Sequence, residues 1–146
     1  MFKRWPAGIL SFERDERHSS SVLFISMILS LLLAAGAALD YARVANMRDV
    51  IDTAVQSASE AGAKALQDGT LGDEAVKTVV LSHFDKKAAV ARHVGTIDPP
   101  AIRVDRATAS VRVDATGVVA MTVGRLIGMD EVAVPATSAV NSADVR

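Results

Sequence analysis

Residues 32–66, LLAAGAALDYARVANMRDVIDTAVQSASEAGAKAL, decide the fold of this chain. The stretch begins as apolar sequence, passes Asp40 and Tyr41, and continues as alanine-rich sequence with charged residues at regular intervals. Neither a proline nor a cluster of polar turn residues interrupts it. The pattern therefore predicts one continuous helix whose first part suits hydrocarbon and whose second part suits water.

An uncharged run, Val22 to Leu39, leads into this stretch. Its 18 residues, ten of which are Leu, Ile, Val or Phe, would span roughly 27 Å as a helix, which is close to the thickness of the hydrocarbon core. The alternative is a cleaved signal peptide, with its cleavage site at Ala35-Gly36-Ala37. The preceding residues are mixed in sign and the helical pattern continues past that site, so we favour a retained membrane helix.

The distribution of basic residues predicts the orientation of this helix. Lys3, Arg4, Arg14 and Arg17 precede the run, whereas only Arg43 and Arg48 follow closely. Because basic residues remain preferentially in the cytoplasm, we expect residues 1–21 to be cytoplasmic, residues 22–39 to span the membrane and residues 40–146 to form an exported domain.

Beyond Asp40, apolar residues recur at alternating steps of three and four, as in a helix that packs along one stripe. We call this stripe the seam, and its members are Val44, Met47, Ile51, Ala54, Ala58, Ala61 and Ala65. Asp40 lies off the seam, so we expect it to stay in water. The seam could pack on the protein's own following domain or on neighbouring helices in an assembly, and the sequence leaves both open. Within the apolar run, Ala34 and Ala38 also permit close helix approach.

The remainder of the chain predicts a second helix followed by a small sheet. Residues 73–87 have helical spacing, and the period changes to two after Pro99-Pro100, so residues 102–116, including Ala107 and Ala109, are expected to be extended. Gly117 is expected to end that strand. A short amphipathic helix, with Val119, Val123, Leu126 and Ile127, should then end at Gly128, and a last strand over 132–140 should lie at an edge because of Pro135.

The predicted fold class is therefore α+β. It comprises a long N-terminal helix that is transmembrane in one half and amphipathic in the other, a second helix, and a small antiparallel sheet with a short inserted helix. Aromatic residues are only 4% of the chain and many of its apolar residues are Ala or Val, so we expect a thin core.

Reactive groups in catalytic arrangements are missing from this sequence. It contains no cysteine, its three histidines have no partner at metal-ligand spacing, and none of the GxSxG, SxxK, HExxH or glycine-rich phosphate-loop motifs occurs. Basic residues form no patch with stacking aromatics, and the net charge is −1. We therefore expect a protein that is not an enzyme and that uses no cofactor, metal or nucleic acid.

The order of these features resembles the TadE/TadG-like family of tight-adherence (Flp) pilus systems. In that family an uncharged helix leads to an Asp-Tyr/Leu-x-Arg motif, matched here by Asp40, Tyr41 and Arg43, and then to a small-residue run. The C-terminal stretch ASVRVDATGVVAMTVGRLIGMDEVAVPATSAV is similar to a second family pattern of strand, short helix and strand. His18 stands where many members have the Gly of a processing site, so we expect the anchor to be retained, and 146 residues leave no room for the metal-binding domain of the long members.

The resemblance implies a pilin-like fold and a minor pilin-like or pilus-assembly protein. It implies a single-pass protein of the bacterial inner membrane, with the domain in the periplasm or outside the cell. The expected partners are the membrane and other pilus-assembly or pilin-like subunits, in a homo- or hetero-oligomer. The alternative hypothesis is a membrane-anchored periplasmic ligand-binding or sensor module.

Overall fold

The computed structural model describes residues 16–145, so most of the predicted cytoplasmic segment 1–21 lies outside the described residues. The chain divides into two compact units, one ending at Ala35 and the other running from Gly36 to Arg146. One helix, α1 (Glu16–Gln67), contains 52 residues and contributes to both units.

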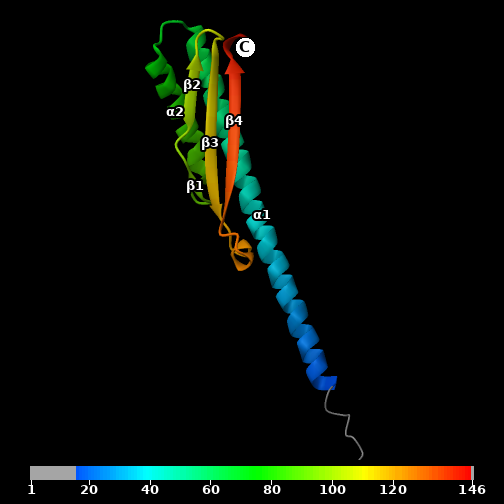
Figure 1. Cartoon of the computed structure of the whole chain (residues 1–146). Helices are drawn as coiled ribbons and strands as arrows, with labels where there is room; N and C mark the ends of the chain where they lie inside the picture. Colours follow the sequence, from blue (N-terminus) through cyan, green and yellow to red (C-terminus); the bar gives the residue numbers. More distant parts are fainter. Residues whose placement is uncertain (1–15, 146) are drawn as a thin grey trace, which may run out of the picture. The chain divides into compact units, whose positions relative to one another are not determined.

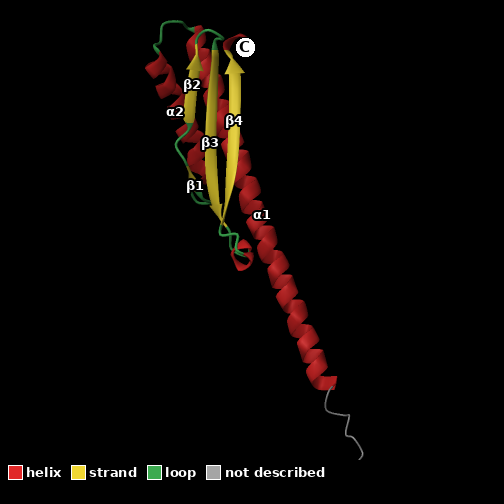
Figure 2. Ribbon diagram, viewed as in Figure 1, coloured by secondary structure: helices red, strands yellow, loops and turns green. Residues whose placement is uncertain are grey.

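The described elements confirm the predicted α+β class (Figures 1 and 2). After α1 come the helix α2 (Asp73–Ala88) and the short 3₁₀ helix η1 (Ala89–Ala91). The remaining elements are β1 (Thr96–Ile97), β2 (Ala101–Asp105), β3 (Ser110–Ala120), the 3₁₀ helix η2 (Gly124–Ile127), β4 (Glu131–Asn141) and the 3₁₀ helix η3 (Ser142–Asp144).

In the first unit, residues 20–35 of α1 are mostly apolar, and all of them are exposed within the chain. Helix α1 is long and apolar enough to cross a membrane, and its most apolar window has a mean hydropathy of 2.5 and no buried residue. Exposed side chains of this kind are unfavourable in water and favourable in lipid.

The sheet of the second unit is antiparallel and is organised around β3. β4 pairs with β3 along its whole length, from Ser110↔Asn141 to Ala120↔Glu131. On the other side of β3, β2 pairs with its first half and β1 with its second half. β4 is therefore an edge strand, as predicted from Pro135. Proline has no N–H to donate, and an edge strand tolerates it because one side of the strand has no neighbouring strand.

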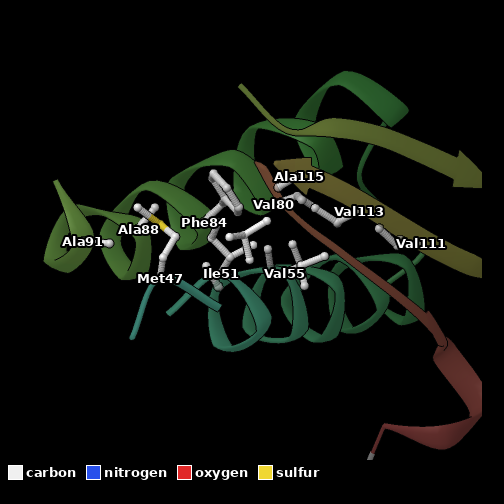
Figure 3. Packing of buried hydrophobic residues seen from close by; sticks show 14 of the residues in the cluster. Met47, Ile51, Val55, Val80, Phe84, Ala88, Ala91, Val111, Val113 and Ala115 are labelled. Atoms are coloured by element: carbon white, nitrogen blue, oxygen red, sulfur yellow. The ribbon is translucent and has the colours of Figure 1, made fainter. Parts of the chain in front are cut away.

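Alternation along β3 directs one face of the sheet onto the helices. Val111, Val113, Ala115, Gly117 and Val119 are buried, whereas the residues that alternate with them are partly or fully exposed. Figure 3 shows Val111, Val113 and Ala115 packing with residues of α1 and α2, among them Ile51 and Phe84. The core is thin, because Phe84 is the one aromatic among its buried residues in the described chain.

Two features of the sheet differ from the sequence prediction. Ala107 and Ala109 belong to the turn between β2 and β3, because the Asp105 carboxylate accepts the N–H groups of Ala107 and Thr108 and bends the chain there. Gly117 does not end the strand, and Val119, predicted to lie in the short helix, is a buried residue of β3. A Cβ on Gly117 would lie 2.3 Å from Ile51 Cδ1, so the glycine lets α1 approach β3 in mid-strand.

The buried face of α1 is also wider than the predicted seam. Val55, Ser59 and Ala63 are buried beside it, although none of them belongs to the three-four pattern. The hydroxyl of Ser59 lies 2.7 Å from that of Ser138 on β4 and also donates to the carbonyl oxygen of Gln56. A helix that covers a sheet buries a broader stripe than a helix that pairs with one other helix.

Candidate functional site

Asp40 is the first charged residue after the apolar run, and it is buried. Its exposed fraction is only 2%, which corrects the expectation that it stays in water. The N–H of Thr122 donates to one carboxylate oxygen at 2.8 Å, and those of Val123 and Gly124 donate to the other at 2.7 and 3.1 Å. Three backbone donors thus replace the water that the carboxylate loses on burial.

These hydrogen bonds keep the carboxylate charged. The N–H of Thr122 has the largest effect and lowers the pKa of Asp40 below its ordinary value, with further contributions from Gly124 and Val123, whereas desolvation opposes the change. The donors belong to the loop between β3 and β4, which we call the exit loop and define as residues 121–130. Asp40 therefore fixes this loop to α1.

The exit loop is held to α1 at two further points. Arg43 donates to the hydroxyl of Thr122 at 2.8 Å, and its guanidinium lies 4.0 Å from the Asp40 carboxylate. One turn before Asp40, a Cβ on Gly36 would lie 2.1 Å from Cγ2 of Val123. Gly36 therefore allows Val123 to lie directly against the helix.

Tyr41 takes no part in this attachment. Its side chain is 76% exposed. Of the three residues of the predicted motif, Asp40 and Arg43 thus bind the exit loop, whereas Tyr41 lies on the surface. Sequence reasoning did not find Thr122, Val123 and Gly124, because their backbone groups make the bonds to Asp40 and backbone groups leave no residue-type signature.

Most of the seam is covered by the chain's own domain. Met47, Ile51, Ala54, Ala58 and Ala65 are buried, and Val44 and Ala61 are partly buried. The structure thus answers the question that the sequence left open for this stripe: α2 and the sheet pack on it.

The opposite side of α1 remains uncovered. At about 100° per residue, Ala38, Ala42 and Ala45 lie on the side of the helix away from Asp40 and Met47, and all three are exposed. Small side chains on this side allow another helix backbone to approach closely, especially where Ala38 continues the apolar run.

A hollow of about 510 Å³ lies elsewhere in the second unit. It is lined by Leu81, Phe84, Asp85, Ala88, Arg92 and residues 95–100. Its charged lining residues Asp85, Arg92 and Asp98 are exposed. Within residues 16–145, no buried side-chain nitrogen or oxygen lacks a hydrogen-bond partner, and no cluster of His, Asp and Glu could hold a metal ion. The hollow therefore offers no set of convergent buried polar groups of the kind that fix a ligand.

We compared the chain with protein-family models, with curated proteins and with solved structures, and none of them matches.

Proposed function

We propose that this chain is a single-span, membrane-anchored pilin-like or pilus-assembly protein of the Flp/tight-adherence type, which acts by helix packing and not by catalysis. The proposal places it in the bacterial inner membrane, with residues 1–21 in the cytoplasm and the second unit exported. The observation that carries it is the dual use of α1: an exposed apolar part, followed by a part whose one face is buried in an α+β domain.

The distribution of burial along α1 supports a particular mode of assembly. The seam from Val44 to Ala65 is occupied by the chain's own core. Other subunits would therefore approach the uncovered side, through Ala38, Ala42 and Ala45. In lipid, helices associate chiefly through close packing of such small residues, because hydrocarbon provides no hydrophobic driving force between helices.

The resemblance to TadE/TadG-like proteins supports the choice of partner. Asp40 and Arg43 of the family motif hold the exit loop, and the C-terminal pattern of the resemblance contains β3, η2 and β4. Both stretches of the resemblance therefore meet at one place in the fold. The proposed partners are pilus-assembly or pilin-like subunits, in a homo- or hetero-oligomer.

The test is the double variant Ala38→Leu/Ala45→Leu in the bacterium that carries the gene. We expect the protein to insert and accumulate normally but pili to be lost, because two leucines on the uncovered side keep neighbouring helices apart. Ala37→Leu is the matched control: it makes the same change at an exposed neighbour of Ala38, about 100° around the helix. Substitutions at Ala54 or Ala58 cannot serve here, because they would disturb the domain's own core.

Normal piliation in the double variant, with the protein present at its usual level, would contradict assembly through this side of α1. Normal piliation after deletion of the gene would contradict the pilus function itself. Cross-linking gives a direct readout, because the native chain has no cysteine and a single Ala38→Cys variant reacts at one position only. We expect this variant to form a cross-linked species with a neighbouring subunit, whereas Ala37→Cys does so much less.

A further inference from the structure

The exit loop carries apolar side chains that the fold leaves exposed. Leu126 is 72% exposed, Ile127 is 78% exposed and Met129 is 48% exposed. Leu126 and Ile127 are adjacent in η2, and Gly128, with φ of +81°, ends that helix and turns the chain towards Met129. Domains in water seldom present neighbouring large apolar side chains in this way unless something covers them.

The attachment of the loop places these side chains beside the end of the apolar run. Asp40 accepts the N–H groups of residues 122–124, which lead into η2. Val123 lies against Gly36, which is four residues before Asp40 in α1. Four residues correspond to about 6 Å along a helix. The loop therefore reaches back past the first charged residue to the last turn of the run that ends at Leu39. Figure 1 shows the loop, in orange, beside α1 at the end of the β3–β4 hairpin.

The surrounding side chains suit a lipid headgroup region. Tyr41 is exposed on α1 next to Asp40, and tyrosine is enriched where membrane helices meet water. Arg43 and Arg125 are about half and two-thirds exposed, and long basic side chains can extend from an apolar surface to headgroups. Asp130 pairs with Arg125 at 3.4 Å, and Asp40 is covered.

We infer that the exit loop is a second membrane contact, in which Leu126, Ile127 and Met129 enter the bilayer interface beside the point where α1 leaves it. The occupant of this surface is lipid and not a protein partner, because the loop is fixed to the last turn of a run that is itself suited to hydrocarbon. The inference rests on the proposed membrane anchor and deepens it: the second unit would then touch the bilayer at two places, α1 and η2.

The test uses the full chain in vesicles of phosphatidylcholine and phosphatidylglycerol. Because the chain has no cysteine, Leu126→Cys and Ile127→Cys can each carry one environment-sensitive fluorophore, and both positions are exposed enough to accept it. Leu29→Cys in the apolar run is the membrane control, and Ala139→Cys on the exposed side of β4 is the aqueous control. The readouts are quenching by a lipid with a nitroxide on its acyl chain and quenching by iodide in the buffer.

We expect labels at positions 126 and 127 to emit further to the blue than the label at 139, to lose emission with the nitroxide lipid, and to resist iodide. One contrary result is that iodide quenches the labels at 126 and 127 as strongly as the label at 139, while the nitroxide lipid quenches the label at 29. That result would overturn the second membrane contact and leave the proposed membrane anchor intact. If the nitroxide lipid also fails to quench the label at position 29, both the second contact and the proposed membrane anchor are contradicted. Protection of 126 and 127 from both quenchers would mean that protein covers the loop, which also overturns the inference.

Discussion

At the scale of single residues, Asp40 connects helix α1 to the loop between β3 and β4. It lies at the start of the polar half of α1, and its partners lie in the loop between the last two long strands. The three bonds come from backbone N–H groups, so they depend on the position of the loop, which the side chains of Thr122 and Val123 help to hold against α1. A buried carboxylate is tolerated at this point because both of its oxygens accept hydrogen bonds.

Asp40→Asn should therefore destabilise the second unit. Asparagine keeps the shape, but its amide group would place hydrogen donors opposite backbone N–H groups that are themselves donors. We expect the thermal midpoint of the full chain in detergent to fall by several degrees at pH 7. Asp49→Asn, at an exposed position on the same helix, is the matched control and should leave the midpoint unchanged.

The effect of Asp40→Asn should depend on pH. Because the pKa of Asp40 is lower in the folded chain than in the unfolded one, its charge contributes stability that is fully present above about pH 5 and is lost as pH falls through the lowered value. The difference in midpoint between the two proteins should thus shrink below about pH 4. The hydroxyls of Thr108 and Thr137 also lower the pKa values of Asp105 and Asp114. Both carboxylates are present in the native chain and in the variant, so their effect on the difference in midpoint cancels. A difference that stays constant down to acid pH would contradict this role of the charge.

At the scale of elements, the contact between α1 and β3 depends on a missing side chain. Gly117 lies in the middle of β3, opposite Ile51 and Met47. Glycine normally weakens a strand, so its presence here reflects the close approach of the helix.

Gly117→Ala tests this approach. The added Cβ would lie 2.3 Å from Ile51 Cδ1 and 2.9 Å from Met47 Sδ, so we expect a loss of about 1–3 kcal/mol in the free energy of unfolding. Ile51→Val removes the Cδ1 atom and alone should cost about 0.5–1.5 kcal/mol. The double variant should then be more stable than the sum of the two losses predicts. Additive losses, measured by denaturant unfolding, would show that a side chain at position 117 does not clash with Ile51.

The elements also show how far the sequence carries a prediction. Periodicity predicted α1, α2, β4 and most of the seam, because apolar spacing reports which face of an element is buried. It failed at Ala107 and Ala109, where the Asp105 carboxylate turns the chain, and at Gly117, where packing overrides the usual meaning of glycine. Val55, Ser59 and Ala63 were missed because the width of the buried stripe depends on what covers the helix.

The candidate site was less predictable than the fold. Asp40 and Arg43 could be singled out by their place in the chain and by the resemblance, but the burial of Asp40 could not. A carboxylate after an apolar run ordinarily marks the return to water. The backbone groups that replace water here come from a loop 82 to 84 residues away, and no local pattern reports them.

At the scale of the whole molecule, stability depends on a small number of large side chains. The chain has four phenylalanines, one tryptophan and one tyrosine. Phe2, Trp5 and Phe12 lie outside the described residues, Phe24 is exposed in the apolar run and Tyr41 is exposed beside it. The core of the second unit therefore depends on Phe84 and a set of valines and alanines around it.

Phe84→Ala should accordingly cost about 3–5 kcal/mol, which is a large share of the roughly 5–15 kcal/mol typical of natural domains. We expect the second unit of this variant to be degraded by added protease at physiological temperature while the native chain resists. Leu81→Ala, on the same helix but 42% exposed, is the control and should remain resistant. Equal resistance of the two variants would show that the core tolerates loss of its aromatic residue.

The hydrogen bonds of Asp40 join residues that are synthesised at different times. Translation proceeds at roughly 5–20 residues per second, so the N–H groups of residues 122–124 are synthesised on the order of 4 to 17 seconds after Asp40 itself. During this interval these three N–H groups are not available to the carboxylate. If α1 inserts into a membrane as proposed, it can therefore do so before its bonds to the exit loop form. The exit loop can bind Asp40 only after α1, α2 and β3 have been synthesised, because all three precede it in the chain.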